Sequence, residues 1–496
     1  MSASPQETPP HDVAIIGYGP VGAALANLLG AMGLTTLVIE REAAAYHLPR
    51  AVHFDDEVMR IFQSMGLAEA ILPHTHVSPG MHFVDATGRL LLDWSRPTAP
   101  GPHGWNISYR FHQPDLERVL REGAARFPSV EVRNRTEVFA LEPGAEDVRL
   151  RFEDLSNGQP GEARARYVVG CDGARSLVRR LIGEAMEDLG FHERWLVVDA
   201  ILDRPRPALG AHSVQHCNPG RPATYVRGTG NRRRWEIALR DDDDLAALSR
   251  PEAAWPLLAR WIAPDDATIE RSAIYTFHST VARRWREGRL LIAGDAAHQT
   301  PPFLGQGMCA GIRDAANLAW KLARVIRGEA PDALLDTYGT ERAPHARGYI
   351  REAVRLGGLI NAKAMEAVLT PEALSGGSAD RLVPLRPALG PGLAAGWTRD
   401  AGVLPPQPRL SNGLPLDDHV GLRFAAVMRP AFAAGLPHAL LDRLSAGGAV
   451  LVAEASPEVT AMLDGLEAQA VLLRPDRHVL GAARNTDDMR ALAEAL

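Results

Sequence analysis

Cysteine, long apolar runs and surplus positive charge are all scarce in this chain of 496 residues. Its three cysteines lie far apart with no CxxC spacing, which argues against a disulfide framework and against a zinc site. No run approaches the roughly 18 uninterrupted apolar residues of a membrane span. Lys and Arg number 54 against 60 Asp and Glu, so no cationic surplus is available for a nucleic-acid backbone. We therefore expect a cytoplasmic protein with no metal centre and no nucleic-acid or membrane partner.

What the chain does contain is the composition of an ordinary globular protein, with 46% hydrophobic and 23% charged residues. Its length suggests two or three domains, each large enough to bury a core. Residues 1–11 are polar and rich in Pro, and we expect a flexible tail there.

The first folded segment has the pattern of a β-α-β unit. Residues 12–17 are a short apolar run, residues 20–32 have helical spacing, and residues 35–40 are a second apolar run. This order predicts two parallel strands joined by a helix.

Three glycines and one acid in that segment form a dinucleotide-binding pattern. Gly17, Gly19 and Gly22 make a GxGxxG between the predicted strand and helix, which is the context that this motif requires. Glycine there permits a tight turn and close approach of a pyrophosphate to the backbone, and the helix N-terminus favours anions. Glu40 ends the second apolar run, where its carboxylate can accept hydrogen bonds from a ribose and disfavours a 2′-phosphate. The nucleotide is therefore FAD or NAD.

Two later motifs favour FAD. Residues 166–180 run from a strand through Asp172 and Gly173 into a helix, and residues 289–308 run from a strand through Asp295 and a glycine-rich loop into another helix. Asp295 at a strand end can bind a ribityl hydroxyl, and the loop leaves backbone N–H groups free for the pyrimidine edge of a reduced flavin. Taken singly, Asp172 could be a helix cap and Asp295 a turn residue. Their joint occurrence in this order indicates FAD.

The rest of the chain divides by composition. Alternating stretches between about residues 195 and 280 predict a mostly antiparallel sheet. Residues 376–413 are rich in Pro, Gly and Ala, which marks a boundary or a long connection. Beyond it, residues 448–453, 470–473 and 477–482 have strand patterns, and residues 457–466 and those from Thr486 onward have helical patterns. They predict a small α/β unit, which contains no cysteine and so no dithiol chemistry.

With these three motifs in this order over roughly residues 12–360, the chain resembles the FAD-dependent aromatic hydroxylases. These are group A, single-component flavoprotein monooxygenases of the 4-hydroxybenzoate hydroxylase and phenol hydroxylase type. Within the group the chain looks most like 3-(3-hydroxyphenyl)propionate hydroxylases. The likeness lies in Pro49-Arg50-Ala51 followed by Asp55-Asp56-Glu57, in residues 118–130, and in the stretch from GDAAH to NLAWKLA. The C-terminal unit resembles the cysteine-free thioredoxin-like appendage of phenol hydroxylase relatives.

The resemblance implies an α/β fold with a Rossmann-like FAD-binding domain of the 4-hydroxybenzoate hydroxylase type, a substrate-binding domain built on a mostly antiparallel sheet, and a C-terminal thioredoxin-like unit. We expect residues 12–80, 105–190 and 281–360 in the FAD-binding domain, residues 81–104 and 191–280 in the substrate-binding domain, a helix and linker at 361–414, and the thioredoxin-like unit at 415–496.

The resemblance also assigns cofactor-binding roles. In the N-terminal motif, Gly17, Gly19 and Gly22 would bind the ADP part, Glu40 the ribose, and Arg41 would neighbour the adenosine. Further along the chain, Arg50 and Gln113 would contact FAD, Asp172 and Gly173 would belong to a motif linked to both FAD and NAD(P)H, Asp295 would bind the ribityl chain, and Pro302, Gly305, Gly307 and Met308 would line the flavin ring. Read without the resemblance, Arg50 could be a surface charge and Gln113 a polar residue at a helix start.

Three residues are candidates for handling the substrate. His53 stands where these relatives usually carry a small residue, and it could accept a phenolic proton or simply pack against its neighbours. Tyr225 and Arg227 lie two apart on a predicted strand, so both side chains fall on one face and could hold a substrate phenol or carboxylate. The pattern leaves open which face turns toward the pocket.

The function implied by the resemblance is ring hydroxylation. NADH or NADPH reduces bound FAD, O2 adds to give a C4a-hydroperoxide, and one oxygen passes to a phenolic acid ortho to its hydroxyl. The best candidate is 3-(3-hydroxyphenyl)propionate or a close analogue. Alternatives are a hydroxylase of a larger polyketide or antibiotic-type phenol, an FAD reductase, and a non-catalytic flavin-binding protein. A homodimer is an expectation from the family.

Overall fold

A mainly parallel sheet carries the N-terminal β-α-β unit. The computed structural model describes residues 9–183, 185–361, 385–393 and 400–496. β1 (His11–Ile16) lies between β2 (Thr36–Ile39) and β11 (Gln159–Gly170) and is parallel to both, as predicted. The row is completed by β8 (Val130–Arg133), β18 (Leu290–Ile292) and β17 (Arg286–Glu287), and β9 (Thr136–Pro143) and β10 (Val148–Asp154) form an antiparallel meander with β11. All four residues of β2 are buried, as expected for a central strand covered on both faces.

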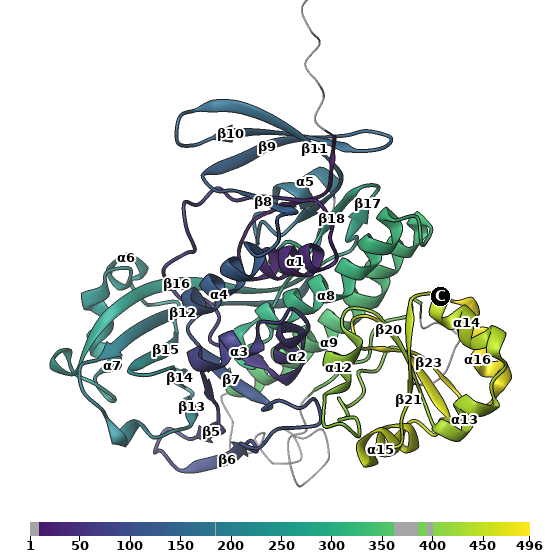
Figure 1. Cartoon of the computed structure of the whole chain (residues 1–496). Coiled ribbons are helices and arrows are strands. Elements are labelled where there is room, and N and C mark those ends of the chain that lie inside the picture. The colour runs from purple at the N-terminus through teal and green to yellow at the C-terminus, as the bar shows by residue number, and fades with distance from the viewer. Residues whose placement is uncertain (1–8, 184, 362–384, 394–399) are drawn as a thin grey trace, which may run out of the picture.

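Helices cover this sheet. α1 (Pro20–Ala31) is buried from Gly22 to Gly30, because its small apolar residues allow close packing against neighbouring elements. It is accompanied by α2 (Asp56–Ser64), α3 (Ala68–Ile71), α4 (Gln113–Ala124), α5 (Leu177–Ile182), α8 (Gly307–Ile326) and α9 (Asp336–Asn361). Figure 1 shows α1 and α8 close together at the centre of the molecule, where α8 starts near the N-terminal motif.

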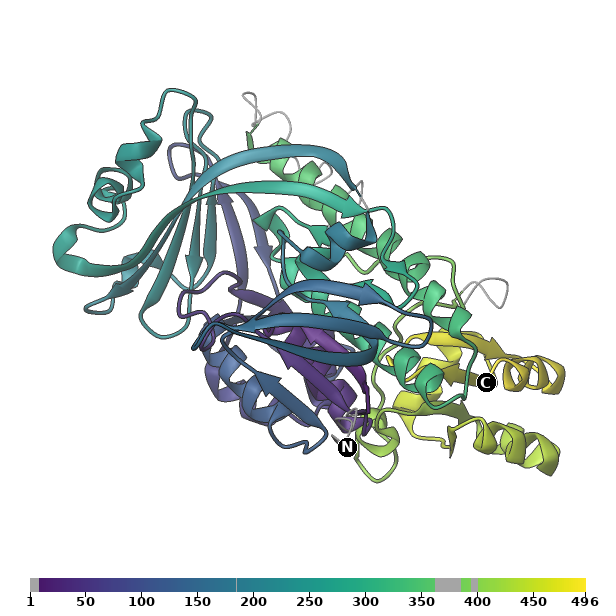
Figure 2. The same cartoon turned by 90° about the horizontal axis from the view of Figure 1, so that it is seen from above.

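The second large sheet is mostly antiparallel, as predicted. Its order is β19 (His298–Gln299), β16 (Ala267–Ala282), β12 (Met186–Leu202), β15 (Arg232–Ala238), β14 (Ala223–Arg227), β13 (Ser213–His216), β5 (Gly80–Val84) and β6 (Leu90–Ser95). Only β13 and β5 pair in parallel within this sheet. The two longest strands, β12 and β16, arch from this sheet back toward the first one (Figure 2). α6 (Leu245–Leu248) and α7 (Trp255–Leu258) lie at its outer end (Figure 1).

A three-stranded sheet completes this part of the molecule. It consists of β3 (His53–Asp55), β7 (Ser108–Phe111) and β4 (Thr75–Val77), with β7 antiparallel to both partners. Its strands hold three side chains, those of His53, Ser108 and Arg110, that matter for the site described below.

The C-terminal part forms a separate four-stranded sheet. Its order is β21 (Ala449–Ala453), β20 (Phe424–Met428), β22 (Ala470–Leu473) and β23 (Val479–Ala483), with β20 and β21 parallel and the other pairs antiparallel. The accompanying helices are α12 (Leu416–Val420), α13 (Pro430–Gly435), α14 (His438–Ala446), α15 (Pro457–Gly465) and α16 (Thr486–Glu494). The elements predicted beyond residue 448 are confirmed, whereas β20 was not foreseen. The thioredoxin-like description of this unit stays a prediction.

Three observations bear on the predicted domain limits. β1 begins at His11, inside the predicted tail. β12 begins at Met186, before the expected start of the substrate-binding domain. Residues 362–384 and 394–399 of the predicted helix and linker, and residues 1–8 of the tail, lie outside the described residues. The domain limits themselves remain predictions.

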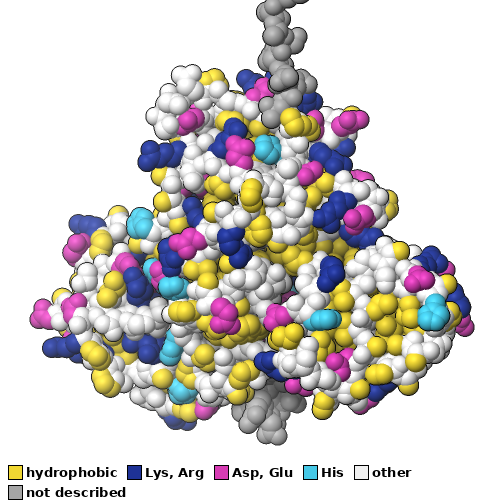
Figure 3. All heavy atoms as spheres, in the orientation of Figure 1, with side chains coloured by type: hydrophobic (Ala, Val, Ile, Leu, Met, Phe, Trp, Pro, Cys, Tyr) yellow, Lys and Arg dark blue, Asp and Glu magenta, His cyan; other side chains and the backbone are white. Residues whose placement is uncertain are grey.

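The surface carries charges of both signs. On the face drawn in Figure 3, Lys and Arg side chains are mixed with Asp and Glu side chains and do not gather in one basic patch. Within the described part of the chain, no helix is both long enough and apolar enough to cross a membrane.

Candidate active site

A cavity of about 490 Å³ lies where the N-terminal motif meets the loops before β3 and α8. Nine of the predicted cofactor-binding residues line it: Gly19, Arg50, Gln113, Gly173, Asp295, Pro302, Gly305, Gly307 and Met308. The opposite wall comes from β12, β15 and β16 of the second sheet, through side chains such as Glu236, Arg271 and Tyr275. Residues scattered over the chain thus converge on one cavity between the two large sheets.

The N-terminal glycine turn has room for a bound phosphate. Gly17 has a φ of 98°, and a Cβ added there would lie 2.5 Å from the Cys171 carbonyl oxygen. A Cβ on Gly22 would lie 2.0 Å from the Gly17 carbonyl oxygen. A Cβ on Gly19, in contrast, would meet no described atom within 4 Å. The first and third glycines are required by the chain's own packing, whereas the second leaves open space in front of the N-terminus of α1, which fits a pyrophosphate.

Glu40 and Arg41 do not line the cavity. The Glu40 carboxylate accepts hydrogen bonds from the backbone N–H groups of Tyr18 (2.6 Å) and Glu42 (2.8 Å), so it holds the glycine turn in place. Arg41 is exposed and forms an ion pair with Glu42 at 3.3 Å. Their predicted contacts with ribose and adenosine remain predictions.

The loop before β3 is held from two sides. The Gln113 side-chain oxygen accepts hydrogen bonds from the backbone N–H groups of Arg50 (3.0 Å) and Ala51 (2.7 Å). From the second sheet, Arg234 donates to the Arg50 carbonyl oxygen (2.6 Å) and pairs with Asp199 (2.7 Å). Gln113 is therefore more than a polar residue at a helix start, because it fixes the backbone of a loop that faces the cavity.

The loop that opens α8 presents free N–H groups to the same cavity. No side chain among the described residues caps α8, and its first internal bond runs from the Ala310 N–H to the Gln306 carbonyl oxygen. The partial positive charge of this helix end suits an anionic ring edge. Arg313 fixes the loop by donating to Gln306 Oε1 (2.9 Å) and Asp55 (2.6 Å). Both the glycine turn and this loop fit FAD.

Asp172 and Asp295 have different surroundings. One Asp172 carboxylate oxygen accepts from the Leu177 N–H (2.7 Å) and the Val178 N–H (3.3 Å), so it caps α5, and it does not line the cavity. Asp295 does line the cavity. Of the two aspartates, Asp295 is therefore the one placed where it could touch the cofactor directly, and Gly173, next to Asp172, also lines the cavity.

A smaller cavity of about 70 Å³ continues from the first toward the second sheet. The two cavities share Val52, Glu236, Pro302 and Gly305 as lining residues. Its remaining walls include the side chains of His53, Ser108, Arg96 and Arg110. We call this space the inner cavity.

Positive charge dominates the inner cavity. The Arg110 guanidinium donates to Ser213 Oγ (3.2 Å), and its Nε has no partner within the described residues. Burial and the neighbouring Arg96 lower the pKa of Arg110 to about 10. Burial, Arg110 and Arg96 lower the pKa of His53 to about 3, so this imidazole is neutral at physiological pH. Burial raises the pKa of Glu236.

Tyr225 and Arg227 lie on the wrong face of β14 for the predicted role. Thr224 and Val226, which alternate with them, line the inner cavity. The Tyr225 side chain is 1% exposed and packs against Trp235 with ring centroids 5.7 Å apart. Strand periodicity correctly placed the two residues together, but the face that turns toward the cavity carries the other pair.

A comparison with protein families identifies the fold. The sequence model of a family described as an FAD binding domain matches residues 10–353. A relative named "Probable NADH-specific resorcinol 4-hydroxylase", from Rhodococcus jostii (strain RHA1), is 38% identical over 98% of this chain and 94% of its own length. The chain belongs to the FAD-dependent aromatic hydroxylases.

Two further comparisons support the assignment of the chain to this family. A "3-(3-hydroxy-phenyl)propionate/3-hydroxycinnamic acid hydroxylase" of Mycobacterium sp. (strain JLS) is 36% identical over 95% of this chain and 89% of its own length. The solved structure of the flavin-dependent monooxygenase PieE, in complex with FAD and substrate, superposes with a TM-score of 0.85 over 99% of this chain and 98% of that chain. At 23% identity, the likeness to PieE shows the fold alone. The hydroxylase is an enzyme that uses FAD, a nicotinamide co-substrate and O2 to oxidise a small aromatic compound.

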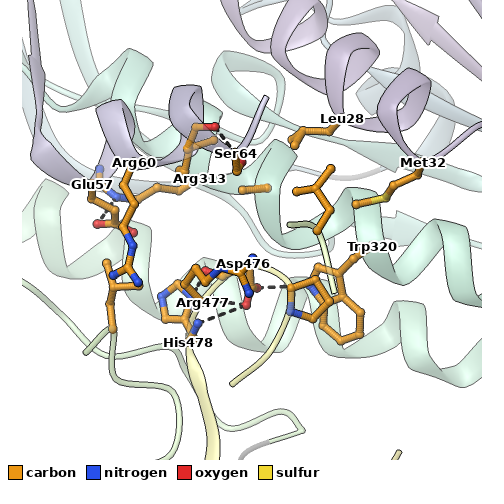
Figure 4. Close-up of a pocket in the computed structure, with 15 residues that line it drawn as sticks. Leu28, Met32, Glu57, Arg60, Ser64, Arg313, Trp320, Asp476, Arg477 and His478 are labelled. Carbon is orange, nitrogen blue, oxygen red and sulfur yellow. Dashed lines mark hydrogen bonds and ion pairs between the residues drawn. The ribbon is translucent and has the colours of Figure 1, made fainter. Parts of the chain in front are cut away.

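The C-terminal unit of the hydroxylase docks on the helix that presents the flavin loop. Figure 4 shows Asp476, from the turn between β22 and β23, facing Trp320 of α8, whose indole N–H donates to it (3.2 Å). His478 of the same turn lies beside Asp476, with 3.5 Å between His478 Nδ1 and the carboxylate. From the same turn, Arg474 pairs with Glu341 of α9 through two bonds of 2.9 Å. All five side chains are buried or nearly so, which makes the C-terminal unit part of the support of α8.

Sequence reasoning missed Ser108, Arg110, Arg96 and Glu236 of the inner cavity. Ser108 and Arg110 are placed by the pairing of β7 with β3, and Glu236 by the pairing of β15 with β12, whereas Arg96 directly follows β6. No local motif marks these residues. Among the described residues, no group of His, Cys, Asp and Glu side chains is arranged to hold a metal ion.

Proposed function

We propose that this hydroxylase adds one oxygen atom to a single-ring phenolic acid, ortho to its hydroxyl, with 3-(3-hydroxyphenyl)propionate or a close analogue as substrate and NADH or NADPH as reductant. The observation that carries the proposal is Arg110. Its guanidinium faces the inner cavity and pairs with no carboxylate of the described residues.

Glu236 is near enough to stabilise the Arg110 charge but forms no ion pair with it among the described residues. An enclosed cation without a paired carboxylate is costly, and a carboxylate from the substrate would offset that cost. The guanidinium presents a planar fork of donors that matches a carboxylate. Arg96 lines the same cavity and adds to its positive potential. An anionic substrate therefore fits this cavity better than a neutral one.

FAD bound in the larger cavity would supply the transfer of electrons from the nicotinamide and the activation of O2. The chain's own residues hold and enclose the reactants. The Pro302–Gly305 loop lines both cavities, so an aromatic ring in the inner cavity lies next to the space suited to the flavin. The apolar wall contributed by Met81, Val226 and Phe303 excludes water from that ring.

Resorcinol is a second candidate, because the relative that aligns over 98% of the chain is named as a resorcinol hydroxylase. Resorcinol has no carboxylate, so it would leave the cavity cations without an anionic group until a hydroxyl ionises. The inner cavity of about 70 Å³ is smaller than the roughly 150 Å³ of a cavity that holds benzene, so even a single ring needs part of the adjoining larger cavity. This disfavours the polyketide alternative, whose fused rings need far more space. A reductase or non-catalytic flavoprotein is disfavoured by the family to which the chain belongs.

The proposal is tested by anaerobic reduction of the purified flavoprotein with NADH and with NADPH. Each is measured without a phenol and with a panel that includes 3-(3-hydroxyphenyl)propionate, 3-hydroxycinnamate and resorcinol. We expect the phenolic acids to accelerate reduction more than resorcinol and to yield a product with one added oxygen. Equal reduction rates with and without every phenol would support the reductase alternative instead. Homodimer formation and a cytoplasmic location also remain proposals.

A further inference from the structure

Ser108 and His53 form a hydrogen-bonded pair in the wall of the inner cavity. They come from the adjacent antiparallel strands β7 and β3, and Ser108 Oγ lies 3.0 Å from His53 Nε2. Both residues line the inner cavity, with exposed fractions of 4% and 7%. The pair is therefore shielded from bulk solvent and open to a substrate.

The direction of this hydrogen bond follows from the other ring nitrogen. His53 Nδ1 lies 3.4 Å from the Gly305 carbonyl oxygen, and a carbonyl can only accept. Nδ1 therefore carries the proton of the neutral imidazole, and Nε2 has a free lone pair. Ser108 must donate its hydroxyl proton to Nε2. The Ser108 oxygen is then left as an acceptor for a group in the cavity.

We propose that the ring hydroxyl of the substrate donates to Ser108 Oγ and that its proton passes through Ser108 to His53 Nε2. The phenol O–H bond breaks as its proton binds the Ser108 oxygen, and the proton that Ser108 held binds Nε2. A neutral phenol and a neutral imidazole become a phenolate and an imidazolium, so the charge of the cavity does not change. Ionising the hydroxyl makes the ring a better nucleophile, which is what hydroxylation requires.

The charges around His53 make the transfer dependent on the substrate. Arg110 of β7 and Arg96 after β6 oppose a positive His53, while Asp55 of β3 favours it. Glu236 of β15 faces the same cavity. Burial is the largest cause of the lowered His53 pKa, and the two arginines add to it. A phenolate formed beside Arg110 offsets the contribution of the arginines. Proton uptake by His53 is therefore coupled to formation of the phenolate.

The inference rests on the proposed function only in requiring a substrate with a ring hydroxyl. The test uses the FAD-loaded enzyme and the variants Ser108→Ala, Ser108→Thr and His53→Gln. His212→Gln is the control, because His212 lies just before β13 and lines neither cavity. Ionisation of bound 3-(3-hydroxyphenyl)propionate is followed by ultraviolet difference spectroscopy as a function of pH, because a phenolate absorbs at longer wavelength than a phenol. Hydroxylation rates are measured in parallel with ring-fluorinated analogues of increasing acidity.

We expect Ser108→Ala and His53→Gln to raise the pH at which the bound phenol ionises and to slow hydroxylation about 100-fold, a typical contribution of positioned proton transfer. The loss should shrink as the analogue becomes more acidic, since an acidic phenol needs less help. Ser108→Thr keeps the hydroxyl and should restore both properties, and the control should match the unmodified enzyme.

Unchanged ionisation of the bound phenol in both variants would overturn the inference, as would a rate loss that does not depend on phenol acidity. Retention of the flavin spectrum and of the melting temperature shows that each variant is folded. If the unmodified enzyme does not bind 3-(3-hydroxyphenyl)propionate, the proposed substrate fails, and the same titration with resorcinol must show the same dependence on Ser108.

Discussion

Replacing Arg110 with Met should weaken binding of phenolic acids far more than binding of phenols without a carboxylate. Met keeps an unbranched apolar side chain of similar reach and removes the charge and all the donors. The Ser213 hydroxyl is the one described hydrogen-bond acceptor of the Arg110 side chain, so the change breaks a single contact of the protein itself.

The size of the effect follows from one charge-assisted hydrogen bond. Such a bond to an enclosed guanidinium contributes about 1.5–3 kcal/mol. Since about 1.4 kcal/mol corresponds to tenfold in affinity, the Kd for 3-(3-hydroxyphenyl)propionate should rise roughly 10- to 150-fold. The Kd for resorcinol should change by a smaller factor.

Binding is measured by the perturbation of flavin absorbance on titration with each phenol. Arg227→Met is the matched control, because Arg227 lies on the face of β14 that does not line the cavity. Its affinity for both phenols should stay within about twofold of the unmodified enzyme. Equal losses for the acid and for resorcinol in Arg110→Met would refute the carboxylate assignment, and a selective loss in Arg227→Met would move the carboxylate site to the other face.

Four further predictions concern the cofactor site and the C-terminal unit. Gly19→Ala should leave the melting temperature of the FAD-free form unchanged, yet bind FAD at least tenfold more weakly, because the new Cβ enters only the space suited to phosphate. Unchanged FAD affinity in a fluorescence titration would contradict this. Gly305→Ala should destabilise the enzyme by about 1–3 kcal/mol in denaturant unfolding, because φ is 63° and the new Cβ would lie 3.0 Å from the His53 ring; a loss below about 0.5 kcal/mol would speak against the described loop. Arg474→Met should cost about 3–5 kcal/mol, because it removes the cation paired with buried Asp476 and leaves buried Glu341 with Lys321 as its cation. A loss under about 1 kcal/mol would show that the C-terminal unit is loosely attached. Burial alone would raise the pKa of Glu341, but Arg474 and Lys321 lower it to about 2, so about 3 kcal/mol of stability should be present above pH 4.5 and lost as pH falls toward 2, with a shallower acid loss in Glu341→Gln.

The sequence was most informative where structure is local. The β-α-β unit, the glycine turn and the loop that opens α8 are each encoded within a continuous segment, and nine predicted cofactor-binding residues do line one cavity. β20 was not foreseen although all five of its residues are buried, because a short apolar strand without flanking turn signals is not distinguished from other apolar segments.

The substrate side was harder to predict for a physical reason. Alternation along β14 fixes which residues share a face, but only the packing of the whole sheet decides which face meets the cavity. In the structure, the face with Thr224 and Val226 meets it. Ser108 and His53 meet because β7 pairs with β3 across more than fifty residues of chain. Their partnership is visible only in three dimensions, although His53 itself was noticed as an unusual residue in its position.

The central claim is that the enzyme inserts oxygen into a phenolic acid. It is tested most directly by mass spectrometry of the products formed from 3-(3-hydroxyphenyl)propionate, NADH and isotopically labelled O2. The account predicts a catechol that carries one labelled oxygen ortho to the original hydroxyl, formed in proportion to the NADH consumed. Full consumption of NADH with hydrogen peroxide as the product and the phenol unchanged would contradict it.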